Sequence, residues 1–200
     1  MGQERPTSYQ KKARKLNAIL VFVDESALQL SPVVRKTWSP RGETPVLKTK
    51  TRSHKKISAI GGLTTTAQGR KQGLVFRLHR GKNVGATECV AFLEQLQLNF
   101  PGRHVFVIWD GLRAHWSKKV ASWIAEHRKF ETFKLPPYAP ELNPIEYIWG
   151  NVKYHQLANL AAESEEELFM ESKAALCKAR QNKSLLRSCL QHAPIKFFDQ

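Results

Sequence analysis

The chain of 200 residues is 42% hydrophobic and has five Trp and ten Phe, which is enough for one substantial core with a small appendage and excludes a disordered chain. Its 32 Lys and Arg against 17 Asp and Glu leave a formal charge of +15, which favours a polyanionic partner, nucleic acid first, over a basic surface kept only for solubility. No run of about 18 apolar residues is present, so we expect no membrane span.

The N-terminal part predicts a basic arm followed by an antiparallel meander. Residues 1–16 are basic with little apolar patterning, and they are predicted to be an arm, a linker or the end of a helix that enters the core. Residues 18–24 are an apolar run typical of a central strand, in which Asp24 shares a face with Phe22 while Glu25 points to the other face. Residues 57–63 and 74–78 are predicted to form a hairpin next to it.

Two segments between the first two strands are candidates for contact with DNA. Residues 31–45 are rich in proline and hold one aromatic, Trp38, among cations that include Arg41. Trp38 either stacks on a base or packs the excursion onto the core. The next segment has five basic residues and no acid, namely Lys48, Lys50, Arg52, Lys55 and Lys56. Such a run is either a solvated face or a contact to DNA phosphates.

The rest of the chain predicts alternating helices and strands. Strands are expected over 105–109 and 131–135, and amphipathic helices over 87–98, over 115–127 and from Asn143 onward. A helix between two strands implies a crossover and parallel pairing. A capping box at Ser164 predicts a helix to about residue 180, followed by a last helical stripe. We therefore expect an α/β core of mixed strand direction over 17–160 and a helical extension over 161–200.

Three carboxylates are candidates for one site. Asp24 and Asp110 each end an apolar run, and Glu146 follows the stiff segment 136–144 in the first turn of a helix. Ligand sites gather at the carboxyl ends of parallel strands, so the two aspartates meet there if their strands are neighbours. Each acid also has an ordinary explanation: the aspartates form turns or caps, and Glu146 completes a capping box with an Asn143 cap.

The chemistry of these residues favours hard divalent cations. Carboxylates clustered without Cys or His suit Mg²⁺ or Mn²⁺, and we expect two ions about 3.5 to 4 Å apart, which would suit displacement at phosphorus. His115, five residues after Asp110, is a candidate for contact with DNA phosphate or with a water near the metals. Its alternative role is a structural contact at the start of a helix.

Four segments together resemble the DDE transposases, in particular the IS630 family of the Tc1/mariner superfamily. They are residues 22–26, 35–42, 107–110 with His115 downstream, and 136–146, of which the last is the most specific. The resemblance covers about residues 16–161 and implies a ribonuclease-H-like fold with a five-stranded mixed sheet. It implies a metal-binding catalytic triad of Asp24, Asp110 and Glu146. Gly111 departs from the asparagine of many relatives.

The activity that the resemblance implies is that of a metal-dependent endonuclease and strand transferase. Such an enzyme cuts double-stranded DNA at transposon ends and joins the freed 3′ hydroxyl to target DNA, and synapsis of two ends favours a homodimer. Relatives read the ends with an N-terminal helix-turn-helix region, which we expect this chain to lack. Scattered Cys89, Cys177 and Cys189 predict a reduced protein, and we expect a bacterial, nucleoid-associated cytoplasmic location. The alternatives are a truncated or domesticated DNA-binding domain that does not cut, or another ribonuclease-H-like nuclease.

Overall fold

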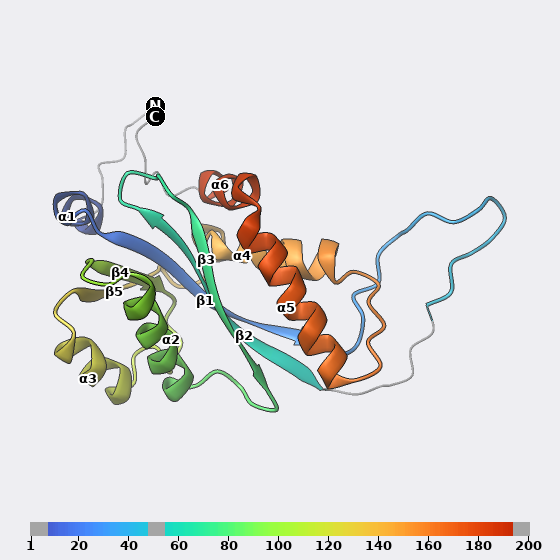
Figure 1. Cartoon of the computed structure of the whole chain (residues 1–200), viewed down its shortest axis with the longest axis horizontal. Helices are drawn as coiled ribbons and strands as arrows, with labels where there is room; N and C mark the ends of the chain where they lie inside the picture. Colours follow the sequence, from blue (N-terminus) through green and yellow to red (C-terminus); the bar gives the residue numbers. More distant parts are fainter. Residues whose placement is uncertain (1–7, 48–54, 194–200) are drawn as a thin grey trace.

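The computed structural model describes residues 8–47 and 55–193, which fold around a five-stranded sheet in the order β3-β2-β1-β4-β5 (Figure 1). The strands are β1 (Ile19–Gln29), β2 (Lys56–Thr66), β3 (Gly73–Arg80), β4 (Val105–Trp109) and β5 (Phe130–Lys134). The first three strands form an antiparallel meander, and β4 and β5 continue the sheet parallel to β1. The predicted α/β architecture with five strands of mixed direction is confirmed.

Helices cover both faces of the sheet (Figure 1). One face carries α2 (Ala86–Asn99) and α3 (Lys118–Glu126), and the other carries α4 (Ile145–Asn151), α5 (Glu165–Gln181) and α6 (Lys183–His192). The period of two along β1 explains this division: Leu20 and Phe22 pack in the cluster of α4 to α6, and Val21 and Val23 in the cluster of α2 and α3. The C-terminal helices therefore share a core with the sheet. No helix of the described residues has the length and apolarity that a membrane crossing requires.

Several element boundaries differ from the prediction, and three of these differences have a clear structural cause. Residues 8–16 form a helix, α1, with Ala13 fully buried, so this part of the basic segment enters the core. β1 does not end at Asp24 but runs to Gln29, because β2 pairs with it along its whole length. α3 begins at Lys118 instead of residue 115, because the Ser117 hydroxyl accepts from the Val120 amide and caps it.

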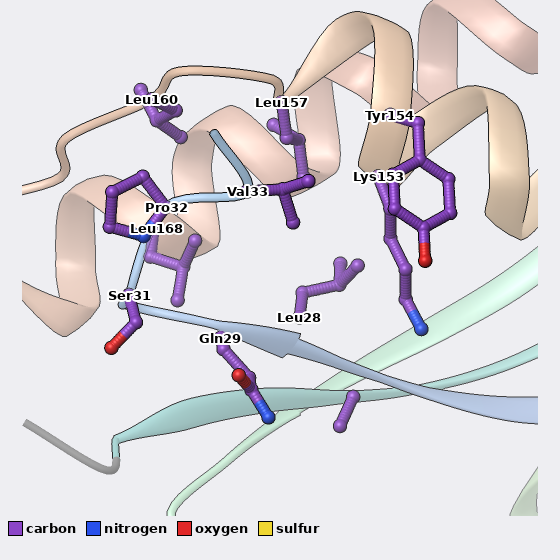
Figure 2. A pocket seen from close by; sticks show the side chains of 11 residues that line it. Leu28, Gln29, Ser31, Pro32, Val33, Lys153, Tyr154, Leu157, Leu160 and Leu168 are labelled. Carbon is purple, nitrogen blue, oxygen red and sulfur yellow. The ribbon is translucent and has the colours of Figure 1, made fainter. Parts of the chain in front are cut away.

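An arm leaves the body between β1 and β2, and its described part spans residues 31–47 (Figure 1). Its base is held by the chain that follows a short π-helix, Val152–Gln156. Asn159 binds Arg35 there through both atoms of its amide, accepting from the Arg35 N–H at 2.8 Å and donating to the Arg35 carbonyl at 3.0 Å. Under the base lies a cavity of about 210 Å³, lined by apolar residues such as Val33, Leu157 and Leu168 and by polar ones such as Lys153 and Tyr154 (Figure 2).

Candidate active site

Asp24, Asp110 and Glu146 line one pocket of about 200 Å³ at the carboxyl end of β4. Asp110 directly follows β4, and Asp24 lies on the neighbouring β1, two residues beyond the last β1–β4 pair, Phe22 with Ile108. Glu146 comes from the first turn of α4. The structure therefore brings together the three carboxylates that the sequence singled out, although they are far apart along the chain.

The triad is spread more widely than a single closed coordination shell. Among residues 8–47 and 55–193, the one group of three Cys, His, Asp or Glu residues whose ligand atoms all lie within 4.8 Å of one another is Glu25, Cys89 and His115. Asp110 and Glu146 are exposed and Asp24 is half-buried, so the pocket is open to solvent. Its far wall is the proline-rich segment 135–140.

Glycine at position 61 lets α4 approach β2 closely enough to place Glu146 in this pocket. Gly61 pairs with Asp24 across the strands, and a Cβ built on it would lie 2.8 Å from the ring of Trp149. Trp149 is buried against this strand, and its indole N–H donates to Oδ2 of Asp24 at 2.9 Å. The same contact thus fixes the helix and orients one carboxylate.

Asn143 does not cap α4, so the capping-box explanation of Glu146 is wrong. Pro144 occupies the N-cap position, and no side chain caps the helix. Asn143 is buried and turned toward β1, where its amide donates to the Val23 carbonyl at 3.0 Å. It thereby ties the proline-rich segment to the strand just before Asp24.

Without a bound cation, the charges of neighbouring carboxylates raise the pKa values of Asp24 and Glu146. Burial raises the pKa of Asp24 to about 7, and the charges of Glu146 and Glu25 act in the same direction. Burial also raises the pKa of Glu146; the charge of Lys153 opposes this effect and that of Asp110 adds to it. A site whose acids resist ionisation in this way favours a bound positive charge.

His115 is buried, so the expectation that it contacts DNA phosphate is wrong. Its side chain is 0% exposed and stacks on the ring of Trp109, with ring centroids 4.4 Å apart. Nε2 lies 2.7 Å from Oε1 of Glu25, and Nδ1 lies 2.9 Å from Oδ1 of Asp110, the latter without the alignment of a hydrogen bond. The predicted orientation of Glu25, away from Asp24, is confirmed by this contact.

The cluster of Glu25, Cys89 and His115 is held by hydrogen bonding and not arranged around a metal. Two ligands of one tetrahedral zinc lie more than about 3 Å apart, which exceeds the 2.7 Å between Glu25 and His115. Burial acts to lower the pKa of His115, but its hydrogen bonds to Cys89 and Glu25 and the charge of Glu25 outweigh burial and raise this pKa to about 10. His115 is therefore a cation between two acids.

Those residues predicted to bind DNA that the structure describes do not line the pocket. Trp38 is 99% exposed on the arm, which excludes the alternative that it packs onto the core, and Arg41 is exposed beside it. Lys55 and Lys56 are exposed at the start of β2. The remaining three, Lys48, Lys50 and Arg52, lie outside the described residues.

Sequence reasoning missed two lysines and a tryptophan next to the triad. Lys153 acts on Glu146 by charge and follows it by seven residues, a spacing of two helical turns that could have signalled it. Trp116 is 44% exposed, and its indole N–H donates to the Asp110 carbonyl at 2.9 Å. The Nζ of Lys134 lies 6.0 Å from the Trp116 ring centroid. No local pattern signals Trp116 or Lys134.

Residues 19–169 match the family described as DDE superfamily endonuclease. A curated relative, the uncharacterized 39 kDa protein of insertion element IS630 from Shigella sonnei, is 25% identical over 140 residues. The match covers 64% of this chain and 36% of the relative, so the chain spans about a third of the length of that protein.

Solved structures of a mariner transposase share the fold. The Mos1 transposase paired-end complex with the left transposon end has a TM-score of 0.61 at 19% identity, and the alignment covers 98% of this chain and 63% of the other. The Mos1 catalytic domain has a TM-score of 0.54 at 15% identity, with 98% and 92% covered. The predicted ribonuclease-H-like fold and the resemblance to the IS630 and mariner group are confirmed. Because the family match runs over all five strands and the helix of Glu146, the chain belongs to the DDE superfamily endonucleases.

Proposed function

We propose that this chain is the catalytic domain of a transposase that cuts double-stranded DNA at transposon ends and joins the 3′ hydroxyl to target DNA. The observation that carries the proposal is the convergence of Asp24, Asp110 and Glu146 in one pocket of a DDE-family sheet. Related structures are described as paired-end and strand transfer complexes of the Mos1 transposase, which supports transposon-end and target DNA as partners.

The residues of the pocket fit Mg²⁺ or Mn²⁺. Its three ionisable ligands are all carboxylates, its lining includes no Cys or His, and crowding raises the pKa of two of the acids. Mos1 complexes with Mg and with Mn are known among the structural relatives. When bound, two such cations would activate the attacking oxygen and stabilise the leaving oxygen at phosphorus. Asp24, Asp110 and Glu146 would hold them.

Protein groups around the triad orient these ligands. Trp149 donates to Oδ2 of Asp24, and the Leu112 amide donates to Oδ1 of Asp110 at 2.9 Å. The charge of Lys153 acts on Glu146, and Lys134 lies beside Gly111 of the pocket, so we assign both lysines to the attraction of a phosphodiester.

The basic residues outside the pocket would hold the DNA backbone. We assign this role to the arm, through Trp38 and Arg41, and to the basic run after it, which comprises Lys48, Lys50, Arg52, Lys55 and Lys56. A homodimer that brings two transposon ends together is part of the proposal. The long exposed arm offers surface for such an assembly.

Removal of one triad carboxylate should abolish nicking. Asp24→Asn, Asp110→Asn and Glu146→Gln each keep the shape of the side chain but remove a charge that a cation requires. The measurement is Mg²⁺-dependent nicking of a transposon-end duplex, with circular dichroism to show that each variant is folded. Glu141→Gln, which changes an exposed acid of the same loop, is the matched control and should keep full activity.

Three results would contradict the proposal. Full nicking by any of the three triad variants would remove that residue from the catalytic set. Faster cleavage of a four-way junction or an RNA/DNA hybrid than of the transposon-end duplex would instead identify another ribonuclease-H-like nuclease. Binding of the duplex without cutting, under conditions that load the metal, would identify a domesticated DNA-binding domain.

A further inference from the structure

The pairing of β1 with β4 ends before it reaches the two catalytic aspartates. Its last pair is Phe22 with Ile108, and Asp24 and Asp110 lie two residues further along each strand. Asp24 is still paired with Gly61 of β2, whereas Asp110 has already left its strand. The β1–β4 ladder therefore does not fix the spacing between these two carboxylates.

A bridge of side chains spans this gap from the opposite face of the sheet. Glu25 follows Asp24 and, with a period of two, points through to the side of α2. Its Oε1 lies 2.7 Å from Nε2 of His115, and Nδ1 of the same ring lies 2.9 Å from Oδ1 of Asp110. The backbone of Asp24 is thus joined to the carboxylate of Asp110 through two side chains.

The middle of this bridge is rigid. The His115 ring lies parallel to the ring of Trp109, at an interplanar angle of 2°. The turn that delivers it is closed by the His115 amide, which donates to the Leu112 carbonyl at 3.0 Å. A ring packed in this way cannot swing away from Asp110 without opening the core.

We propose that Glu25 and His115 are positioning residues that hold Asp110 at the distance from Asp24 that a shared divalent cation requires. The inference rests on the proposed function, because it concerns the same metal ligands. Neither residue lines the pocket. Both act through Asp110, Glu25 by its hydrogen bond to His115 and His115 by its charge contact with the Asp110 carboxylate, as the residues behind metal ligands do in general.

Substitutions of Glu25 separate the hydrogen bond from the packing. Glu25→Leu removes the acceptor of His115, so the affinity for Mn²⁺, measured by electron paramagnetic resonance on the full chain without DNA, should fall about 10- to 100-fold. Glu25→Gln keeps an acceptor oxygen in the same place and should recover most of that affinity. Nicking should follow the same order, and higher Mn²⁺ should restore it in Glu25→Leu.

A matched control and a second variant keep the test decisive. Glu131→Leu removes another ion-paired carboxylate, which lies 2.7 Å from the Lys12 ammonium at the start of β5, and it should leave Mn²⁺ affinity unchanged. His115→Gln keeps a donor for Glu25 but lacks the nitrogen that faces Asp110, and it should weaken Mn²⁺ binding as Glu25→Leu does. If Glu25→Leu does not fold, the comparison of His115→Gln with the unsubstituted protein decides the question.

The outcomes distinguish this inference from the proposed function. If Glu25→Leu and His115→Gln lower the melting temperature but bind Mn²⁺ like the unsubstituted protein, the bridge is only structural and the inference is overturned. If Asp24→Asn and Asp110→Asn also bind Mn²⁺ normally, the metal site itself is wrong and the proposed function fails with it. Loss of binding in the aspartate variants alone overturns only the positioning role.

Discussion

Asp24, a proposed metal ligand, costs free energy when it is ionised in the metal-free protein. It lies half-buried between Glu146 and Glu25, which with burial raises its pKa to about 7. The Trp149 indole that donates to it acts in the opposite direction. An acid in such a place is poorly satisfied by the protein alone, as expected where a cation completes the structure.

This conflict predicts that Asp24→Asn stabilises the metal-free protein at high pH. Because the folded pKa is raised from 3.8 to about 7, the stability that protonated Asp24 contributes is fully present below pH 3.8 and is lost as the pH rises through about 7. In EDTA at pH 8, Asp24→Asn should therefore be more stable by up to about 4 kcal/mol, and the gain should vanish below pH 4. Urea unfolding at several pH values measures it, and an equal gain at all pH values would contradict it.

The places of some site residues can be predicted from the sequence, whereas the contacts of others are seen only in the folded structure. Asp24 and Asp110 were predictable because each follows an apolar run, and Glu146 because proline fixes the loop before it. The partner of Glu25 was not, since His115 is 90 residues away. Asn143 was misjudged because local capping rules do not include the Val23 carbonyl, 120 residues distant.

At the scale of elements, the position of α4 depends on the surface of β2. Two glycines, Gly61 and Gly62, stand opposite Asp24 and Val23, and helices of opposite faces lie against them. A Cβ at Gly62 would lie 2.7 Å from Val21 and 3.1 Å from Phe92 of α2. β2 therefore lacks side chains at the two positions where α4 and α2 pack closely on its opposite faces.

Gly61→Ala should displace α4 and impair both stability and nicking. The added Cβ has Trp149 at 2.8 Å and Ile145 at 3.0 Å, so we expect a loss of about 1 to 3 kcal/mol in the free energy of unfolding. Nicking should fall further than the folded fraction does, because Glu146 moves with the helix. Gly150→Ala is the control within α4: it has open space and should stabilise by up to about 1 kcal/mol. Unchanged stability of Gly61→Ala would refute the packing argument.

Helices and strands with a strong apolar pattern were predicted well. Those whose ends are set by pairing with a distant strand, or by a capping residue, were predicted less well. The apolar run 105–109 matches β4 from end to end. The last five residues of β1 carry no strand pattern of their own, and β2 imposes the extended conformation on them. The segment 115–117 has helical apolar spacing, but Ser117 supplies the cap that delays α3.

At the scale of the whole molecule, the proposal assigns the triad pocket and the arm, two separate surfaces, to one DNA substrate. The arm adds exposed Trp38 and Arg41 to a chain with a formal charge of +15. Backbone contacts of this kind give affinity without sequence preference. The composition revealed this general property, whereas the extension of the arm away from the body appears only in the fold (Figure 1).

Arg41→Ala should weaken the binding of any duplex and reduce its salt dependence. Loss of one phosphate contact should lower the slope of log affinity against log salt by about 1, irrespective of sequence. Fluorescence anisotropy at several salt concentrations measures the slope. Arg128→Ala, an exposed arginine just before β5 at the other end of the sheet, is the control and should leave the slope unchanged. A slope unaltered in Arg41→Ala would exclude the arm from the DNA interface.

The base of the arm has a mechanical consequence. Arg35 and Val33 are bonded to Asn159, and Arg35 also donates to the Tyr154 carbonyl within the π-helix that continues α4. The base of the arm is therefore hydrogen-bonded to the same continuous helical segment that carries Glu146. Because Tyr154 follows Glu146 by eight residues, a displacement of the base of the arm would act about two helical turns from the third carboxylate.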